Sequence, residues 1–337
     1  MNSPHTRNGG DPQGFKGLAW FAGTMVTVVL GVAVGANGLF DHLLRRPLAE
    51  AAPASPTQPA TMAQHPTAPA PAPSRTAFAP PPESAMPDGE YGRVIRLGEN
   101  IFRETGKYAA QYVGNSLSCA NCHLDAGRKP DSAPMWAAFA HYPAFRSKTG
   151  QVDTLASRLQ GCFMYSMNGK APPQDSEIMT ALQTYAFWLA QGAPVGLPIP
   201  GSGYPKLKQP AQPADYARGE KVYAQNCALC HGADGQGQRS GDAQVFPPLW
   251  GAESFNWGAG MHQLANAAGF IQANMPLGKG GSLSTQEAWD VAMFMNSHER
   301  PQDPRFTGSV EGTRQKYHDS GDSMYGRRVG GHLLGSP

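Results

Sequence analysis

The sequence predicts a mainly α-helical protein in which one small domain occurs twice. The motif Cys-x-x-Cys-His occurs at Cys119–His123 and again at Cys227–His231, an offset of 108 residues. A helical pattern follows each motif, and a glycine–aromatic pattern precedes each one, in the forms Gly98-x-x-x-Phe102 and Gly219-x-x-x-Tyr223. Solenoid repeats are about 20–50 residues long, so an offset of this size indicates a duplicated domain.

Each copy is expected to end in an amphipathic helix. In the first copy, apolar residues recur at spacings that place them on one helical face: Ile178, Leu182, Tyr185 and Leu189. In the second copy, Ser284 and Glu287 have the spacing of a capping box, in which each side chain bonds the backbone N–H of the other residue. We therefore expect a helix to begin there, with an apolar stripe through Ala288, Val291, Ala292 and Met295.

Composition and length bound the rest of the chain. The 337 residues include 40 Gly and 31 Pro, and the charged fraction of 15% is below that of an average globular protein. The net charge of +2 gives no field that would attract nucleic acid, so no nucleic-acid partner is expected. Runs rich in Gly and Pro set the expected boundaries: an N-terminal anchor or signal segment at 1–46, a Pro/Ala-rich linker at 47–88, the first domain at 89–191, a linker at 192–213, the second domain at 214–303 and a Gly-rich tail at 304–337.

The N-terminal segment is expected to be a transmembrane helix. Residues 17–40 carry no charge, and about 20 apolar residues are enough to cross a bilayer. The alternative is a cleaved signal peptide, with Val34-Gly35-Ala36 as the cleavage site, which would leave a soluble protein. The linker at 47–88 has few large apolar side chains, so we expect a disordered spacer that holds the folded domains off the membrane.

Cys-x-x-Cys-His is the attachment motif of c-type haem. Two sulfurs form thioethers to one porphyrin, and the adjacent histidine becomes the proximal iron ligand. Zinc would need further ligands nearby, and a thioredoxin-like pair needs no histidine. We therefore expect two cytochrome c domains on the periplasmic side of a bacterial cytoplasmic membrane. Each carries one covalent haem c, with attachment through Cys119, Cys122, Cys227 and Cys230 and proximal ligands His123 and His231.

Met275 is the expected sixth iron ligand in the second copy. It lies 44 residues after His231, in a loop before the last helix. His/Met ligation raises the haem potential and suits electron transfer. The other interpretation is a core methionine, and Met261 and Met293 are rival ligands among the 13 methionines.

Cys162 is the fifth cysteine and has no partner in a motif. A lone cysteine is usually a small buried hydrophobe. Here a free thiol would face an oxidising compartment, and Cys162 lies 39 residues after His123, close to the ligand position of the other copy. We therefore expect Cys162 to be the distal iron ligand or a reactive thiolate over the first haem, with Met164 and Met167 as rival ligands.

Four stretches between residues 90 and 306 resemble the dihaem thiosulfate dehydrogenases: NCHLDAGRKPDSAPMWAAF, YPAFRSKTGQVDTLASRLQGCFMYSMNGK, PPLWGAESFNWGAGM and NMPLGKGGSLSTQEAWDVAMFMNSHERPQDPRF. The second is the most specific, because it carries Cys162. The resemblance implies His/Cys ligation at the first haem, the active site, and His/Met ligation at the second, the electron exit. It implies oxidation of two thiosulfates to tetrathionate, reversible in principle, with electrons passed to an external acceptor such as a soluble cytochrome or a membrane oxidase.

The same stretch contains groups suited to an anionic substrate. Two thiosulfate dianions repel each other, so their coupling requires cationic or hydrogen-bonding groups. The resemblance implies that Arg158, Ser166 and Lys170 serve with Cys162, whereas Arg146 and Lys148 are weaker candidates. For each basic residue, a solvated surface charge or a haem-propionate partner is the other interpretation.

Other functions fit part of the pattern. A membrane-tethered dihaem electron carrier without catalysis would have methionine ligands at both haems and no activity with thiosulfate. A sulfur-oxidising cytochrome with a persulfide on its cysteine ligand would work with a carrier protein, and its motifs match less well. A peroxidase would have an open distal site. Cys162 argues against the carrier and against the peroxidase.

Overall fold

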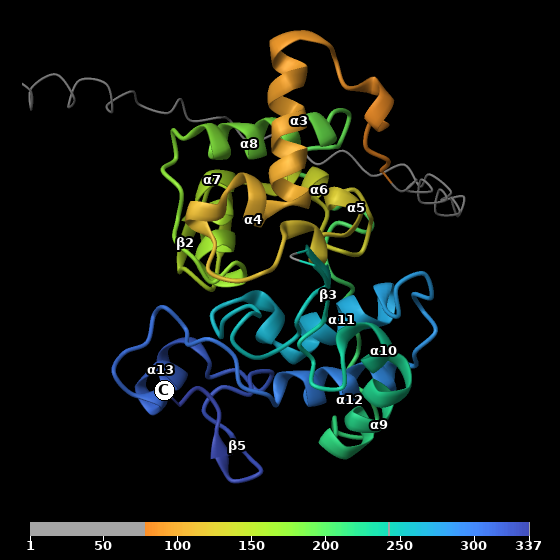
Figure 1. Cartoon of the computed structure of the whole chain (residues 1–337), viewed down its shortest axis with the longest axis vertical. Helices are drawn as coiled ribbons and strands as arrows, with labels where there is room; N and C mark the ends of the chain where they lie inside the picture. Colours follow the sequence, from red (N-terminus) through yellow and green to blue (C-terminus); the bar gives the residue numbers. More distant parts are fainter. Residues whose placement is uncertain (1–77, 242, 337) are drawn as a thin grey trace, which may run out of the picture. The chain divides into compact units, whose positions relative to one another are not determined.

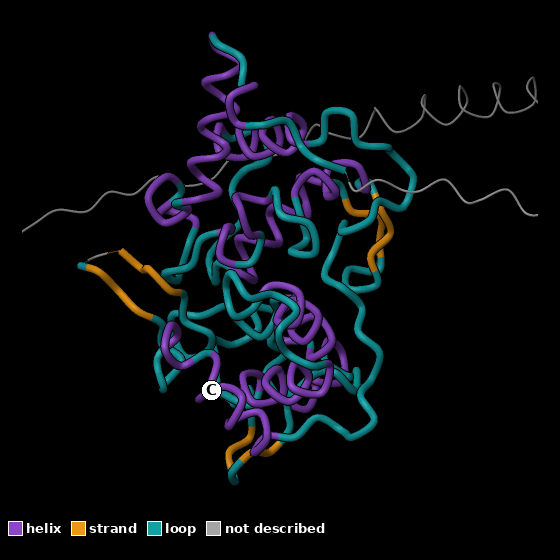
Figure 2. The backbone as a smooth tube through the Cα atoms, turned by 90° about the vertical axis from the view of Figure 1, so that its right-hand side faces the viewer, coloured by secondary structure: helices purple, strands orange, loops and turns teal. Residues whose placement is uncertain are grey.

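The structure, a computed structural model, describes residues 78–241 and 243–336. The segment expected at 1–46, with its membrane span at 17–40, and most of the linker expected at 47–88 lie outside these residues. Among the helices of the described residues, none has the length and apolar character needed to cross a membrane. This part of the chain is mainly helical, as the sequence predicts, and its strands pair in short antiparallel hairpins (Figure 2).

The first domain is built around α3 (Gly89–Arg103) and α8 (Glu177–Leu189), which pack against each other (Figure 1). They approach closely at Gly98, where a Cβ atom would lie 2.2 Å from Ala181 O. The predicted apolar face of α8 is confirmed, because Leu182, Tyr185 and Leu189 are buried. Ile178, the first residue of that face, is partly buried against the same core. The other elements are α4 (Thr105–Tyr108), α5 (Leu124–Gly127), α6 (Met135–His141), α7 (Leu155–Gly161), β1 (Ala144–Arg146), β2 (Gln151–Asp153), the π-helical turn η4 (Cys162–Ser166) and the 3-10 turns η1 (Glu83–Ala85), η2 (Ala110–Tyr112) and η3 (Cys119–Asn121).

The second domain repeats this arrangement. α9 (Tyr216–Asn226) packs against α12 (Thr285–Asn296), and a Cβ atom at Gly219 would lie 2.0 Å from Asp290 O. The repeated glycine therefore has the same steric cause in both copies. The capping box of Ser284 and Glu287 is confirmed at the start of α12. The other elements before residue 304 are α10 (Ala228–His231), α11 (Leu264–Asn274), β3 (Gln238–Ser240), β4 (Ala243–Phe246) and the 3-10 turn η5 (Gly260–His262).

Each domain has its own apolar core. The first contains Trp136, Trp188 and Tyr185, and the second contains Trp257 and Trp289, all with at most 3% of their surface exposed. Met261 packs at the edge of both cores. Side chains from both copies therefore meet between the two motifs.

Two segments expected to lie outside the domains pack onto them. Residues 78–88, the end of the expected linker, contact the first domain, where the Phe78 and Trp136 rings lie 5.1 Å apart. The expected tail forms α13 (Val310–Tyr317), β5 (Arg328–Val329) and β6 (His332–Leu333), and it buries Tyr325 and Leu334 in the second core. Large apolar side chains within these Gly- and Pro-rich stretches explain why they fold onto the domains.

Candidate functional site

Each Cys-x-x-Cys-His motif borders a cavity. The first cavity has a volume of about 280 Å³ and is lined by Cys119, Cys122 and His123. The second has a volume of about 270 Å³ and is lined by residues that include the motif Cys227, Cys230 and His231. Leucine, phenylalanine, methionine and proline side chains make up much of both walls. An apolar cavity beside two thiols and an imidazole suits a covalently attached porphyrin.

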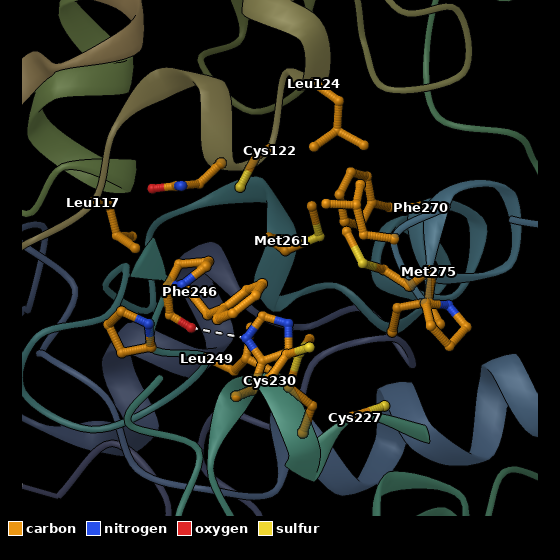
Figure 3. Close-up of a pocket in the computed structure, with 18 of the residues that line it drawn as sticks. Leu117, Cys122, Leu124, Cys227, Cys230, Phe246, Leu249, Met261, Phe270 and Met275 are labelled. Carbon is orange, nitrogen blue, oxygen red and sulfur yellow. Dashed lines mark hydrogen bonds between the residues drawn. The ribbon is translucent and has the colours of Figure 1, made fainter. Parts of the chain in front are cut away.

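The orientation of both histidine rings suits an iron ligand. His123 Nδ1 lies 2.6 Å from Ala133 O, and His231 Nδ1 lies 2.9 Å from Pro247 O, the bond dashed in Figure 3. A carbonyl oxygen only accepts, so each Nδ1 donates and each Nε2 keeps its lone pair. Burial lowers the pKa of His123 to about 4 and also lowers the pKa of His231, which keeps the rings neutral at pH 7. Both motifs therefore fit haem c.

Cys162 faces the first cavity from the junction of α7 and η4. The capping box of Thr154 and Ser157 starts α7, and the helical path continues through η4, so residues four apart lie on successive turns. Arg158, Cys162 and Ser166 accordingly line the same cavity. Arg158 Nη1 donates to Cys162 Sγ at 3.3 Å, and the charge of Cys162 raises the pKa of Arg158. The structure thus brings together three of the four predicted catalytic residues.

The other basic candidates differ in position. Arg146 lines the first cavity, and its Nη1 donates to the hydroxyl of Tyr142, which lines the cavity too. Lys170 is exposed and is not among the residues that line the two cavities. Its part in substrate binding stays a prediction.

Lys148 contacts η4, the turn that begins at Cys162, but it is not among the residues that line the first cavity. Its Nζ donates to Gly258 O of the second domain and lies 3.8 Å from the centre of the Tyr165 ring. Burial, with repulsion from Arg305 and Arg158, lowers the pKa of Lys148 to about 7. A lysine charge that titrates near neutral pH therefore lies close to the candidate site.

Tyr204 is a cavity residue that the sequence reasoning missed. It belongs to the segment expected at 192–213 as a linker, yet it lines the first cavity, and burial raises the pKa of its hydroxyl. Its ring also makes an edge contact with Phe270 of the second domain, at 5.6 Å between centroids. The signal in the sequence that could have indicated its role is a single aromatic residue within a run rich in Gly and Pro.

The two cavities share a wall. Leu117, Cys122, Phe255 and Met261 line both of them. Cys122 belongs to the first motif, and Phe255 and Met261 belong to the second domain. Groups bound in the two cavities would therefore contact these same four side chains.

Met275 lines the second cavity, together with its rival Met261 (Figure 3). In the view of Figure 3 both side chains lie below Cys122 of the first motif and above Cys230 of the second, with Met275 to the right of Met261. The other rival, Met293, is not among the lining residues. At the first cavity, Met167 contributes to the wall, whereas Met164 does not. The loop position expected for Met275 is thus compatible with ligation.

Comparisons with known proteins agree with this geometry. Residues 106–195 match the family described as SoxA/TsdA, cytochrome c domain, and residues 214–295 match cytochrome C oxidase, cbb3-type, subunit III. The chain is 58% identical over 258 residues to a thiosulfate dehydrogenase of Thiomonas intermedia, covering 77% of this chain and 82% of the relative. It is 55% identical over 260 residues to one of Stutzerimonas stutzeri, covering 77% and 85%.

A solved structure is also similar. Thiosulfate dehydrogenase (TsdBA) from Marichromatium purpuratum matches with a TM-score of 0.75 and 50% identity. The match covers 78% of this chain and 58% of that longer chain. Two tandem cytochrome c domains are thus confirmed, and such domains bind haem c. Family membership follows from 58% and 55% identity over most of both chains: the chain belongs to the dihaem thiosulfate dehydrogenases, a family of c-type cytochrome enzymes.

Proposed function

We propose that the chain oxidises two thiosulfate ions to one tetrathionate, with the first cavity as the active site and Cys162 as the reacting group. The contact between Arg158 and Cys162 carries this proposal, because it pairs a cation with a sulfur nucleophile beside a haem attachment motif. The names of the relatives from Thiomonas intermedia and Stutzerimonas stutzeri support thiosulfate as the substrate.

The residues that would hold the haem groups are assigned on the same basis. Cys119 and Cys122 would attach the first haem, with His123 and Cys162 as axial ligands; the second would take Cys227, Cys230, His231 and Met275. The haem groups, when bound, supply one-electron acceptors, which side chains do not provide. Thiolate ligation lowers a haem potential relative to His/Met ligation, so this assignment makes the second site the electron exit.

The proposed reaction at Cys162 has two steps, and atoms and electrons balance in each. Arg158 offsets the negative charge of the thiolate and of thiosulfate, and this lets the two sulfurs approach. The sulfane sulfur bonds to Cys162 Sγ and gives Cys–S–S–SO₃⁻ with loss of two electrons. A second thiosulfate attacks the sulfane sulfur of this adduct, so that tetrathionate leaves and the thiolate is restored. Ser166 would donate to the sulfonate oxygens, and Lys170 would attract the dianion from outside. Run backwards, the same steps reduce tetrathionate.

The electrons would leave through an external acceptor. The wall shared by the two cavities supports transfer from the first site to the second. A soluble cytochrome or a membrane oxidase would then take them from the second domain. We place the protein on the periplasmic side of the cytoplasmic membrane, held by the span at 17–40, or soluble there if that segment is cleaved; this rests on the sequence.

Steady-state oxidation of thiosulfate with an artificial acceptor tests the proposal. Cys162→Gly should abolish turnover while both haems remain attached. Cys162→Met, which offers a sulfur ligand without a nucleophile, should also be inactive. Asn100→Ala, at an exposed position of α3, is the matched surface control and should behave as wild type. A fully active Cys162→Gly enzyme would rule the scheme out, and an inactive wild type with methionine ligands at both haems would favour the non-catalytic carrier.

A further inference from the structure

The turn that carries Cys162 and Ser166 is held by the other domain. A helix leaves its last carbonyls without intrahelical partners, and η4 ends at Ser166. The carbonyl oxygens of Met164 and Tyr165 accept from Asn256, through its Nδ2 at 2.9 Å and its backbone N–H at 3.2 Å. The next carbonyl, Ser166 O, accepts from Asn115 Nδ2 at 2.9 Å. Three successive carbonyls of the catalytic turn are therefore satisfied by two asparagines.

Both Nδ2 hydrogens and the Oδ1 atom of the Asn256 side chain are hydrogen-bonded. Its second Nδ2 hydrogen goes to Asn168 Oδ1 at 3.0 Å, and its Oδ1 accepts from Gly258 N at 3.0 Å. Since Met164 O only accepts and Gly258 N–H only donates, these partners fix which side-chain atom is nitrogen. Asn256 is 1% exposed, so no water would replace these bonds cheaply.

The segment that carries Asn256 is anchored on its other side. The Trp257 backbone N–H donates to Pro301 O at 3.0 Å, and its indole Nε1 donates to Glu299 Oε1 at 2.7 Å. Asn115 adds a bridge within this contact, because its Nδ2 also donates to Ser254 O at 3.1 Å. The turn is thus fixed against a firmly held part of the second domain.

We propose that Asn256 is a positioning residue for the first haem site: the second domain completes that site by fixing the turn that presents Cys162 and Ser166. This inference rests on the proposed function of Cys162. Asn256 touches neither substrate nor haem in this scheme; it acts through the backbone of Met164 and Tyr165. Displacement of reacting groups by about 1 Å can cost on the order of 100-fold in rate, so the loss of these bonds should be visible in turnover.

The test compares Asn256→Ala, Asn256→Asp and Asn256→Ser in the full-length holoprotein, with Asn100→Ala as the control. The alanine removes the side-chain donor, the aspartate sets a carboxylate against the carbonyl of Met164, and the serine keeps a hydroxyl donor. We expect kcat for thiosulfate to fall by roughly 10- to 100-fold, with Asp lower than Ala and Ser closest to wild type. The low-spin electron paramagnetic resonance signal of the first haem should become heterogeneous, while that of the second stays unchanged.

Two results would overturn the proposal. One is wild-type kcat with a homogeneous first-haem signal in the Ala and Asp variants. The other is equal disturbance of both haem signals, including in the Ser variant, which would indicate general unfolding. The haem signals also separate this inference from the proposed function. If wild type failed to oxidise thiosulfate, the function would fall, yet selective change at the first haem would still support positioning by Asn256.

Discussion

Arg158 Nη1 donates to the sulfur of Cys162 at 3.3 Å, one helical turn away in the sequence. A guanidinium stays protonated over the whole physiological pH range, so the contact places a fixed positive charge beside this sulfur at any working pH. The same cation faces a cavity in which a dianionic substrate is proposed to bind. The positive charge of Arg158 therefore offsets negative charge on the groups of the site and on the bound substrate. This reduces the repulsion within the site and the repulsion between the site and the substrate.

Replacing Arg158 by Gln should lower kcat/KM for thiosulfate by roughly 100-fold or more, the usual cost of removing one donor that stabilises developing negative charge. Arg158→Lys should recover only part of this, because an ammonium does not reproduce the planar fork of a guanidinium. Steady-state kinetics with an artificial acceptor measures both variants. Arg93→Gln, exposed on α3, is the control for loss of one positive charge. Equal kcat/KM for Arg158→Gln and wild type would contradict the assigned role.

Lys148 should make substrate binding depend on pH. Burial and the neighbouring Arg305 and Arg158 lower the pKa of Lys148 to about 7, so it is charged below that pH and neutral above it. Loss of this cation behind the site should raise KM for thiosulfate as the pH rises from 6 to 8. KM measured across this range is expected to vary less in Lys148→Met. Lys107→Met, at an exposed site on α4, should keep the wild-type profile, and identical profiles in all three proteins would refute this role.

Met275 should determine the ligation of the second haem. Met275→Leu is expected to remove the methionine ligation signal of one haem and to lower its potential, because His/Met ligation raises the potential. Met261→Leu and Met293→Leu are matched controls, one inside the second cavity and one outside its lining. Redox titration with absorption spectroscopy compares the three. A methionine signal that survives in Met275→Leu and disappears in Met261→Leu would assign the ligand to Met261.

Local patterns accounted for much of the candidate site. Arg158, Cys162 and Ser166 are four residues apart, so any helical path brings them to one face. Gly98 and Gly219 recur because each allows a backbone carbonyl of the partner helix to approach within van der Waals range. The first feature depends on residues that are close in sequence, and the second depends on the missing side chain at one position. Both can be recognised in a single sequence.

Contacts between segments that are far apart in the sequence could not be predicted from local patterns. Tyr204 and Asn256 lie far along the chain from Cys162, and no periodicity relates their positions to it. The tail beyond residue 304 is Gly-rich and basic, a composition that fits either a loose segment or one that wraps the domains, and the structure shows that it buries Tyr325 and Leu334. Tertiary packing decided these three cases, and it overrides local composition.

A buried carboxylate, that of Asp303, holds the C-terminal segment to the second domain through Arg305 and His318. Asp303 Oδ2 lies 2.9 Å from His318 Nε2 and 2.6 Å from Arg305 Nη2, and the side chains of Asp303 and His318 are fully buried. Although burial alone would raise it, hydrogen bonds from His318 and Arg305 hold the pKa of Asp303 far below its usual value. His318 Nδ1 in turn lies 3.2 Å from Nε2 of His262, the residue after Met261.

Removing the Asp303 carboxylate alone should destabilise the protein more than replacing it together with its partners. Asp303→Asn leaves the largely buried Arg305 guanidinium without its carboxylate, and an uncompensated charge in a buried site typically costs about 3–5 kcal/mol of unfolding free energy. The triple variant Asp303→Leu with Arg305→Met and His318→Phe replaces the carboxylate and both partners by apolar groups, so it should be more stable than Asp303→Asn. Denaturant unfolding of the holoprotein measures the three, with Asp319→Asn, an exposed neighbour, expected within about 0.5 kcal/mol of wild type. If Asp303→Asn unfolded at the same midpoint as Asp319→Asn, the Asp303 carboxylate would have no role in holding this segment.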